Sequence, residues 1–171
     1  MSDRSVELAK QSINGESKYN YFIVGIAAAT FAYFGKDFIP NPPLGWNQSS
    51  VLLSGLVLLI LSIVAGLKKI EEHNTLLRKN GKYLDFYEQF AAYKQNSIDG
   101  NASINLESGE VLTPDESTKN AKQLESLLPE FKSELDRRST KISIYNNTRD
   151  YALFGGYILL GFSKFFPMLN T

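Results

Sequence analysis

The sequence predicts an all-α membrane protein with three transmembrane helices and a cytoplasmic antiparallel helical stalk that carries a small β-hairpin and helix at its tip. Three observations predict this fold. Three apolar segments are almost free of charge, two helical stripes run through the polar region between the second and third segments, and turn and cap residues separate the stripes. The mean hydropathy of −0.18 hides this segregation of apolar and polar stretches.

The first two apolar segments have the length and composition of membrane spans. Residues 19–34 (YNYFIVGIAAATFAYF) and 51–67 (VLLSGLVLLILSIVAGL) hold no charged residue, and the first has aromatic residues at both ends. A helix needs roughly 17 to 25 apolar residues to cross a bilayer, and aromatic rings gather at the two interfaces. We therefore predict spans at about 19–35 and 51–67. The short proline-rich link 36–50 makes them an antiparallel hairpin.

The third segment, 151–166 (YALFGGYILLGFSKFF), carries one charge, Lys164, near its end. A lysine at a helix end can extend its ammonium to the interface at modest cost. Residues 162–170 (FSKFFPMLN) also resemble residues 34–41 (FGKDFIPN) at the end of the first span. This similarity indicates two helix exits on the same side of the membrane. A re-entrant or surface-lying segment is the alternative.

The distribution of lysine and arginine predicts the orientation. The long middle region holds thirteen of these residues, whereas the first link and the C-terminal tip hold only Lys36 and Lys164. Because cytoplasmic loops are enriched in positive charge, we expect a multi-pass protein of the bacterial inner (plasma) membrane with its N-terminus cytoplasmic and its C-terminus outside. The predicted parts are a cytoplasmic N-terminal amphipathic segment (1–18), a transmembrane hairpin (19–67), a cytoplasmic stalk and tip (68–150), and a third transmembrane helix with the outer C-terminus (151–171).

The stalk is predicted from two hydrophobic stripes. On the outgoing side Ile70, Leu77, Leu84 and Ala91 recur every seven residues, in a helix weakened at Gly81. Four further apolar residues widen this stripe: Leu76, Phe86, Tyr87 and Phe90. The returning stripe consists of Leu128, Phe131, Leu135, Ile142 and Tyr145. Such stripes predict an antiparallel pair of helices that can associate further with copies of itself as a coiled coil.

The tip is predicted to contain a β-hairpin and a short helix. Ile104 and Leu106 precede a Ser-Gly turn and Val111 follows it, so this segment favours a small hairpin that presents these three side chains to a partner. Thr113 is then placed as an N-cap, with proline next and a capping-box Glu116 three residues on. The predicted helix runs to about residue 127, where Pro129 breaks or restarts it.

Composition argues against an enzyme and against a cofactor or metal. The chain has no cysteine and a single histidine, His73, whose neighbours Glu71 and Glu72 do not converge with it on one helix face. Basic and acidic residues number 18 each, so no global field favours nucleic acid. We predict no catalytic residues, no cofactor and no nucleic-acid partner.

Two other patterns suggest contacts within or near the membrane. Small residues four apart let helix backbones approach closely, within one chain or between chains. These predicted packing residues are Gly25, Ala29, Ser62, Gly66, Ala152 and Gly156. A basic cluster after the second span either binds anionic lipid headgroups or only sets topology. It consists of Lys68, Lys69, Arg78, Lys79 and Lys82.

From Val6 to Gln95 the chain resembles the SLATT-type small membrane effectors of bacterial nucleotide-signalling and anti-phage systems. The resemblance lies in the order of a polar N-terminal helix, a tight two-span hairpin and a cytoplasmic helix that begins LKKIEE. A third span after a structured tip departs from that pattern. The resemblance implies a homo-oligomer that forms a pore or disrupts the membrane after a cytoplasmic signal. The alternative is a non-conducting anchor that recruits a cytoplasmic partner protein.

Overall fold

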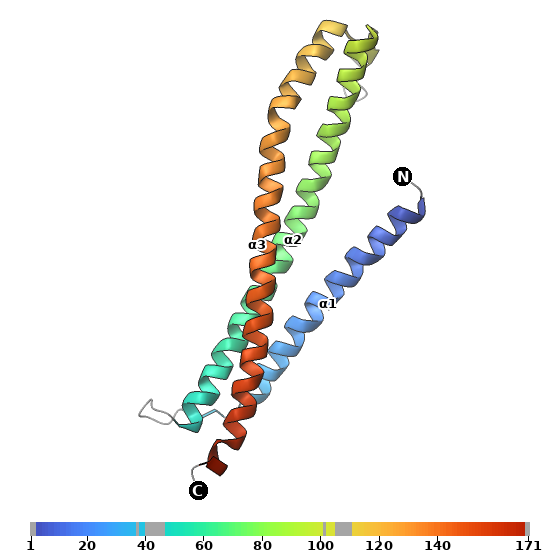
Figure 1. Cartoon of the computed structure of the whole chain (residues 1–171). Helices are drawn as coiled ribbons and strands as arrows, with labels where there is room; N and C mark the ends of the chain where they lie inside the picture. Colours follow the sequence, from blue (N-terminus) through green and yellow to red (C-terminus); the bar gives the residue numbers. More distant parts are fainter. Residues whose placement is uncertain (1–2, 37, 40–46, 101, 105–110, 170–171) are drawn as a thin grey trace. The chain divides into compact units, whose positions relative to one another are not determined.

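The computed structural model of this chain consists of three long helices and one two-stranded hairpin (Figure 1). It describes residues 3–36, 38–39, 47–100, 102–104 and 111–169. The helices are α1 (Asp3–Gly35), α2 (Gln48–Asp99) and α3 (Pro114–Leu169), and the strands are β1 (Ser103–Ile104) and β2 (Val111–Leu112). The predicted all-α class is confirmed. Each apolar segment continues as helix into a polar neighbour, so the helices are longer than the predicted spans.

The chain divides into two compact units. Unit 1 comprises residues 1–72 and 141–171, and unit 2 comprises residues 73–140. Helices α2 and α3 contribute to both units without an intervening loop. The domain boundaries predicted at residues 67 and 150 separate transmembrane from cytoplasmic parts, and they remain predictions.

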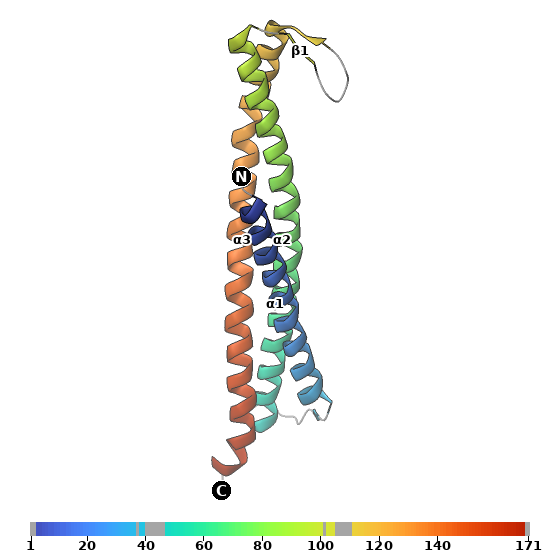
Figure 2. The same ribbon diagram turned by 90° about the vertical axis from the view of Figure 1, so that its right-hand side faces the viewer.

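Unit 1 is a three-helix bundle. In Figures 1 and 2 its segments of α1 and α3 run in the same direction and α2 runs against them. Leu56, Leu59 and Leu160 form its buried core, and five partly buried side chains pack against them. These are Phe31, Phe34, Phe38, Leu52 and Leu153. The ends of α1 and α3 lie together, because the Lys164 ammonium lies 5.5 Å from the centroid of the Phe34 ring.

Two glycines bring α2 and α3 into backbone contact. A Cβ added at Gly156 would lie 3.0 Å from Leu59 Cδ2 and 3.3 Å from the carbonyl oxygen of Gly55. A Cβ added at Gly55 would lie 3.0 Å from Leu160 Cδ2. By contrast, a Cβ at Gly25 would have no neighbour within 4 Å. Glycine is therefore required for packing at 55 and 156 and not at 25.

Unit 2 is an antiparallel pair formed by the remaining parts of α2 and α3, with the hairpin beyond the end of α2 (Figure 2). The Phe86 and Phe131 rings pack with centroids 5.2 Å apart. The Lys79 ammonium binds the Glu134 carboxylate, and Arg138 Nη2 lies 3.3 Å from the same oxygen. Ser97 and Thr118 hydroxyls share a hydrogen bond of 2.6 Å nearer the hairpin. Aromatic packing and one ion-pair group thus hold the two helices together.

The tip confirms the predicted cap and corrects the predicted helix end. β1 and β2 pair antiparallel, with Ile104 opposite Val111. The Thr113 hydroxyl accepts from the Glu116 amide at 3.3 Å, and the Glu116 carboxylate accepts from the Thr113 amide at 2.8 Å, which is a capping box. The prediction that Pro129 interrupts this helix is wrong, because α3 is continuous from Pro114 to Leu169. Packing of the Phe131 turn against α2 outweighs the lost hydrogen bond.

One helix of the described chain, α2, is long and apolar enough to cross a membrane by length and composition alone. Its most apolar window has a mean hydropathy of 2.6, which agrees with the predicted second span. The predicted first and third spans do not reach that level, because alanine, glycine and tyrosine replace much of the leucine and isoleucine found in the second. The count of three spans therefore remains a prediction.

We predict that Gly156→Ala destabilises the chain by about 1 to 3 kcal/mol, because the new methyl group meets a backbone carbonyl that cannot rotate away. The matched variant Gly25→Ala should be neutral or stabilising by up to about 1 kcal/mol, since alanine favours helix and the site is open. Unfolding in mixed detergent, followed by circular dichroism, measures both. Equal losses would contradict the close approach of α2 and α3.

We predict that the Glu134 ion-pair group makes unit 2 less stable in acid. Its hydrogen bond from Lys79 lowers the pKa of the Glu134 carboxyl from the usual 4.5. A lowered folded-state pKa contributes stability above the unfolded-state pKa, and that stability is lost as pH falls through the folded-state pKa. Glu134→Gln should therefore lower the thermal midpoint at neutral pH, and the difference from wild type should shrink as pH falls below 4.5. Glu130→Gln, one turn earlier at an exposed position, should leave the thermal midpoint at neutral pH unchanged.

Candidate functional site

The most unusual feature of unit 1 is a set of buried polar side chains contributed by all three helices. Asn20 on α1, Lys69 on α2 and Arg149 on α3 are only 1%, 6% and 2% exposed. The Asn20 carboxamide oxygen accepts hydrogen bonds from Lys69 Nζ at 2.9 Å and from Arg149 Nη1 at 2.7 Å. The Asn146 oxygen accepts from the same two cations, at 2.9 Å each. We call these four residues the polar clamp.

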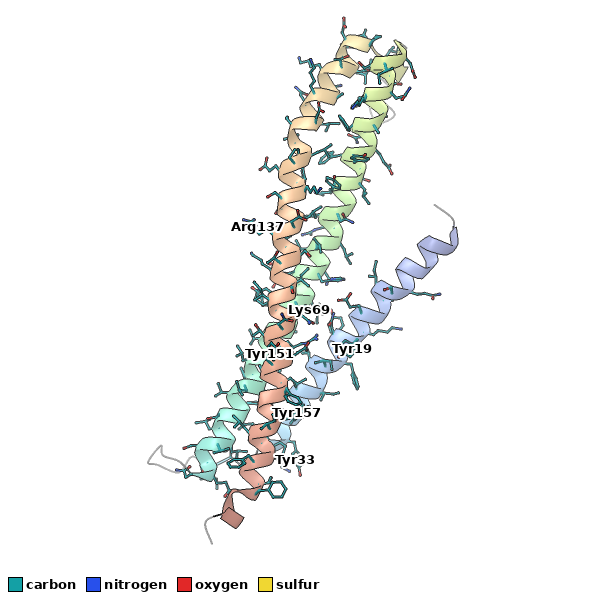
Figure 3. The ribbon with its side chains drawn as sticks, viewed as in Figure 1. Tyr19, Tyr33, Lys69, Arg137, Tyr151 and Tyr157 are labelled. Atoms are coloured by element: carbon teal, nitrogen blue, oxygen red, sulfur yellow. The ribbon has the colours of Figure 1, made fainter. Side chains whose placement is uncertain are left out.

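Two carboxylates balance the two cations of the polar clamp. Asp150 Oδ1 lies 2.7 Å from Arg149 Nη2, and Glu16 Oε1 lies 3.4 Å from Lys69 Nζ. Both carboxylate side chains are about half exposed, so the negative charges face outward while the cations stay buried. The ring of Tyr19 lies over the guanidinium, with its centroid 5.9 Å away. Figure 3 shows Lys69 and Tyr19 at the same level of unit 1.

Backbone contacts reinforce the polar clamp. The Ser62 hydroxyl is 1% exposed and donates to the Arg149 carbonyl at 2.9 Å. A Cβ at Gly66 would lie 2.5 Å from Val24 Cγ2 and 3.3 Å from Arg149 Cδ, so glycine is what lets the arginine and α1 approach α2. A second link between α1 and α3 joins the hydroxyls of Thr30 and Tyr157 at 3.2 Å.

The clamp holds the three helices together. Lys69 and Arg149 donate to the Asn20 and Asn146 oxygens, and the Asn146 amide and Arg149 Nε donate to Asp150. Breaking a buried, hydrogen-bonded charge leaves the partner charge uncompensated at a cost of about 3 to 5 kcal/mol. Asn20 opens the 19–34 segment, Lys69 follows the 51–67 segment, and Arg149 precedes the 151–166 segment. The clamp therefore ties together the same end of all three apolar segments.

The predicted small-residue pairs fall into two groups. Ser62, Gly66, Ala152 and Gly156 are buried and serve packing within the chain. Gly25 and Ala29 are exposed on α1, as are their neighbours Ala28 and Ala32. The first group accounts for the close approach of helices in unit 1, and the second leaves a face of small residues on α1.

The five basic residues predicted to bind lipid headgroups are in unlike surroundings. Lys69 belongs to the polar clamp, Lys79 binds Glu134, and Lys68 donates to Glu71 at 2.7 Å. Arg78 and Lys82 are exposed. Lipid binding by the five basic residues stays a prediction. Lys69 is directed at protein groups and not at the surface.

Within the predicted partner-binding tip, Val111 is 64% exposed. The backbone of Ile104 pairs with it, and Leu106 lies outside the described residues. In the part of the chain that the structure describes, no group of three or more acidic, histidine or cysteine side chains is placed to hold a metal.

The sequence patterns did not predict Asn20, Asn146 or the burial of Lys69 and Arg149. Lys69 is predicted as a charge that binds lipid headgroups or sets topology, and Arg149 counts among the basic residues of the middle region. The sequence does carry a signal for the clamp. An asparagine interrupts the aromatic start of the first segment, and a polar residue stands just after the second segment and just before the third. The convergence of these polar residues becomes evident only when the three segment ends lie side by side in the fold.

No family model, curated protein or solved structure matches this chain. The resemblance to SLATT-type effectors therefore stays a prediction.

We predict that Asn20→Leu destabilises unit 1 by about 2 to 5 kcal/mol, because two buried cations lose a shared acceptor. The matched control is Asn147→Leu, an exposed asparagine on α3 beside the clamp. Detergent unfolding, monitored by circular dichroism, compares the two. A loss no larger at Asn20 than at Asn147 would mean that the clamp is not structurally important.

Proposed function

We propose that this chain is a self-associating inner-membrane effector: unit 1 lies in the bilayer and unit 2 receives a cytoplasmic signal. The output is a pore or a local disruption of the membrane, and antiviral defence is the setting that fits such a device. The alternative is a non-conducting anchor that recruits a cytoplasmic partner protein.

The observation that carries the membrane proposal is the apolar exterior of unit 1. Large hydrophobic side chains are exposed on all three helices, and not only on α2. Soluble monomers rarely expose contiguous apolar patches larger than a few hundred Å². The exposed side chains include Tyr19, Tyr21, Phe22, Tyr33, Val57, Ile60, Leu61, Val64, Leu67, Tyr151, Phe154, Ile158, Phe162 and Phe165. Lipid is the solvent that suits such a surface. The presence of this surface on all three helices supports three membrane spans.

The position of the polar clamp supports the proposed orientation. Lys69 and Arg149 lie at the end of unit 1 from which the chain enters residues 73–140, which hold nine of its eighteen lysine and arginine residues. Cations at the cytoplasmic boundary agree with the positive-inside rule. Burying them against Asn20 and Asn146 keeps them out of the hydrocarbon while the half-exposed Glu16 and Asp150 reach water.

The outward face of small residues on α1 supports self-association in the membrane. Gly25, Ala28, Ala29 and Ala32 lie on the surface of unit 1, where a neighbouring helix could approach closely. A chain of this kind needs several copies for conduction, because the contact of Gly55 with Gly156 closes the bundle of a single copy. The same close packing favours the alternative of a non-conducting anchor.

We expect overproduction of the chain in bacteria to collapse the membrane potential and admit an impermeant dye, because assembled copies breach the bilayer. The matched variant carries Gly25→Leu and Ala29→Leu, which fill the small-residue face without touching the clamp. It should still fractionate with the membrane and should leave the potential largely intact. Potential-sensitive fluorescence and dye uptake measure both.

Three outcomes would overturn parts of this proposal. If the potential survives overproduction while a cytoplasmic protein co-purifies, the effector reading fails and the anchor stands. If alkaline carbonate extracts the wild-type chain from membranes, the membrane placement of unit 1 fails. A reporter fused after Thr171 that stays cytoplasmic would reduce the spans to two.

A further inference from the structure

Within unit 2, helix α2 carries two parallel stripes that differ by one residue in register. Both alternate in steps of three and four residues, the spacing of coiled-coil seams. Every member of the inner stripe is partly buried, and every member of the outer stripe is exposed. The inner stripe is Leu76, Lys79, Tyr83, Phe86, Phe90, Tyr93 and Ser97. The outer stripe is Leu77, Asn80, Leu84, Tyr87, Ala91, Lys94 and Ile98.

Three members of the inner stripe contact side chains of α3. Lys79 binds Glu134, Phe86 packs on Phe131, and Ser97 bonds Thr118. These contacts extend along the length of the α2–α3 pair. The stripe predicted from the sequence divides between the two: Leu76, Phe86 and Phe90 belong to the inner stripe, and Leu77, Leu84 and Ala91 belong to the outer stripe.

The outer stripe is apolar at every seventh residue and is exposed along its length. Leu77 is 36% exposed, Leu84 is 50% and Ile98 is 71%. Leu77 and Asn80 also border a groove of about 390 Å³ whose other wall includes Leu135 of α3. An apolar residue at every seventh position from Leu77 to Ile98 is not needed for a solvated helix face.

We propose that the outer stripe is the seam of a parallel, in-register coiled coil between α2 helices of two copies of this chain. In that register each apolar seam residue packs against the same residue of the other copy, and these residues are Leu77, Leu84, Ala91 and Ile98. Asn80 meets Asn80, whose carboxamides donate to and accept from each other, and a polar layer of this kind selects register. The parallel direction rests on the proposed function, because copies anchored in one membrane enter unit 2 from the same side.

The charges of α2 suit an identical partner. The positions that flank the outer stripe on its free side are Asn74, Gly81, Glu88 and Gln95, and on its other side the inner stripe supplies Leu76, Tyr83, Phe90 and Ser97. Glu88 is the one charged residue among these eight, and in a parallel pair it faces Tyr83 of the second copy. The cations Arg78 and Lys82 lie off the seam, so two copies bring no like charges together there.

Lys94 is the exception within the outer stripe. Its ammonium lies 5.5 Å from the centroid of the Phe90 ring on the inner stripe. This cation–π contact draws the charge away from the seam and leaves the aliphatic stem in it. One such layer weakens the seam, which suits an association that the membrane anchor strengthens by raising the effective concentration.

The absence of cysteine makes disulfide trapping a direct test. The full chain in membranes is given a single cysteine, Leu84→Cys or Leu77→Cys, and is oxidised with copper phenanthroline. We expect a covalent dimer, because in-register seam positions bring two Cβ atoms to disulfide distance. The matched controls Lys82→Cys and Gln89→Cys are exposed on α2 but off the stripe. They should cross-link at least about fivefold more slowly.

The other outcomes overturn the proposal. Equal cross-linking at Gln89→Cys and Leu84→Cys would mean random collision. Cross-linking of a Leu77→Cys chain to a Lys94→Cys chain, with none at Leu84→Cys alone, would mean an antiparallel pair. Adducts to another protein in place of a dimer would assign the stripe to a partner. The readout is independent of membrane potential, so a trapped dimer in cells that keep their potential leaves the seam standing while the effector proposal fails.

Discussion

One carboxamide oxygen, that of Asn20, stands between two buried cations from two other helices, and the arrangement of unit 1 depends on it. Lys69 and Arg149 would repel each other across so short a distance in a medium of low dielectric constant. The neutral acceptors Asn20 and Asn146 screen that repulsion, and the two carboxylates balance the charge from the rim. Close helix packing at Gly55, Gly66 and Gly156 is possible because the clamp holds α1, α2 and α3 in one register.

Much of the fold could be predicted from the sequence because its signals are local. Runs with no charge or a single one mark the three apolar segments, and a threonine, a proline and a glutamate at fixed offsets mark the start of α3 at Pro114. The seven-residue spacing of Leu77 and Leu84 indicates a helix regardless of what it packs against. These patterns involve neighbours within one or two turns, so they need no knowledge of the rest of the chain.

The errors arise where two helices meet. Pro129 is a helix breaker by propensity, yet packing of Phe131 on Phe86 keeps α3 continuous through it. The stripe predicted on α2 combined members of the inner and outer stripes, and the inner stripe, through Phe86, makes the contact with α3. A single residue is about 100° of rotation on a helix, so spacing alone cannot choose between the two. The polar clamp could not be predicted either, because its members are far apart in sequence.

The sequence separation within the clamp has a consequence for biosynthesis. Lys69 and Asn146 are 77 residues apart, with the whole of unit 2 between them. While the ribosome is still making unit 2, α1 and the unit 1 part of α2 are already made, and Lys69 has only Asn20 and Glu16 as partners. Unit 1 therefore completes its assembly only after α3 is made, so the last helix synthesised closes contacts begun by the first. A chain that stalls before Asn146 leaves Lys69 without one of its two acceptors and the bundle unfinished.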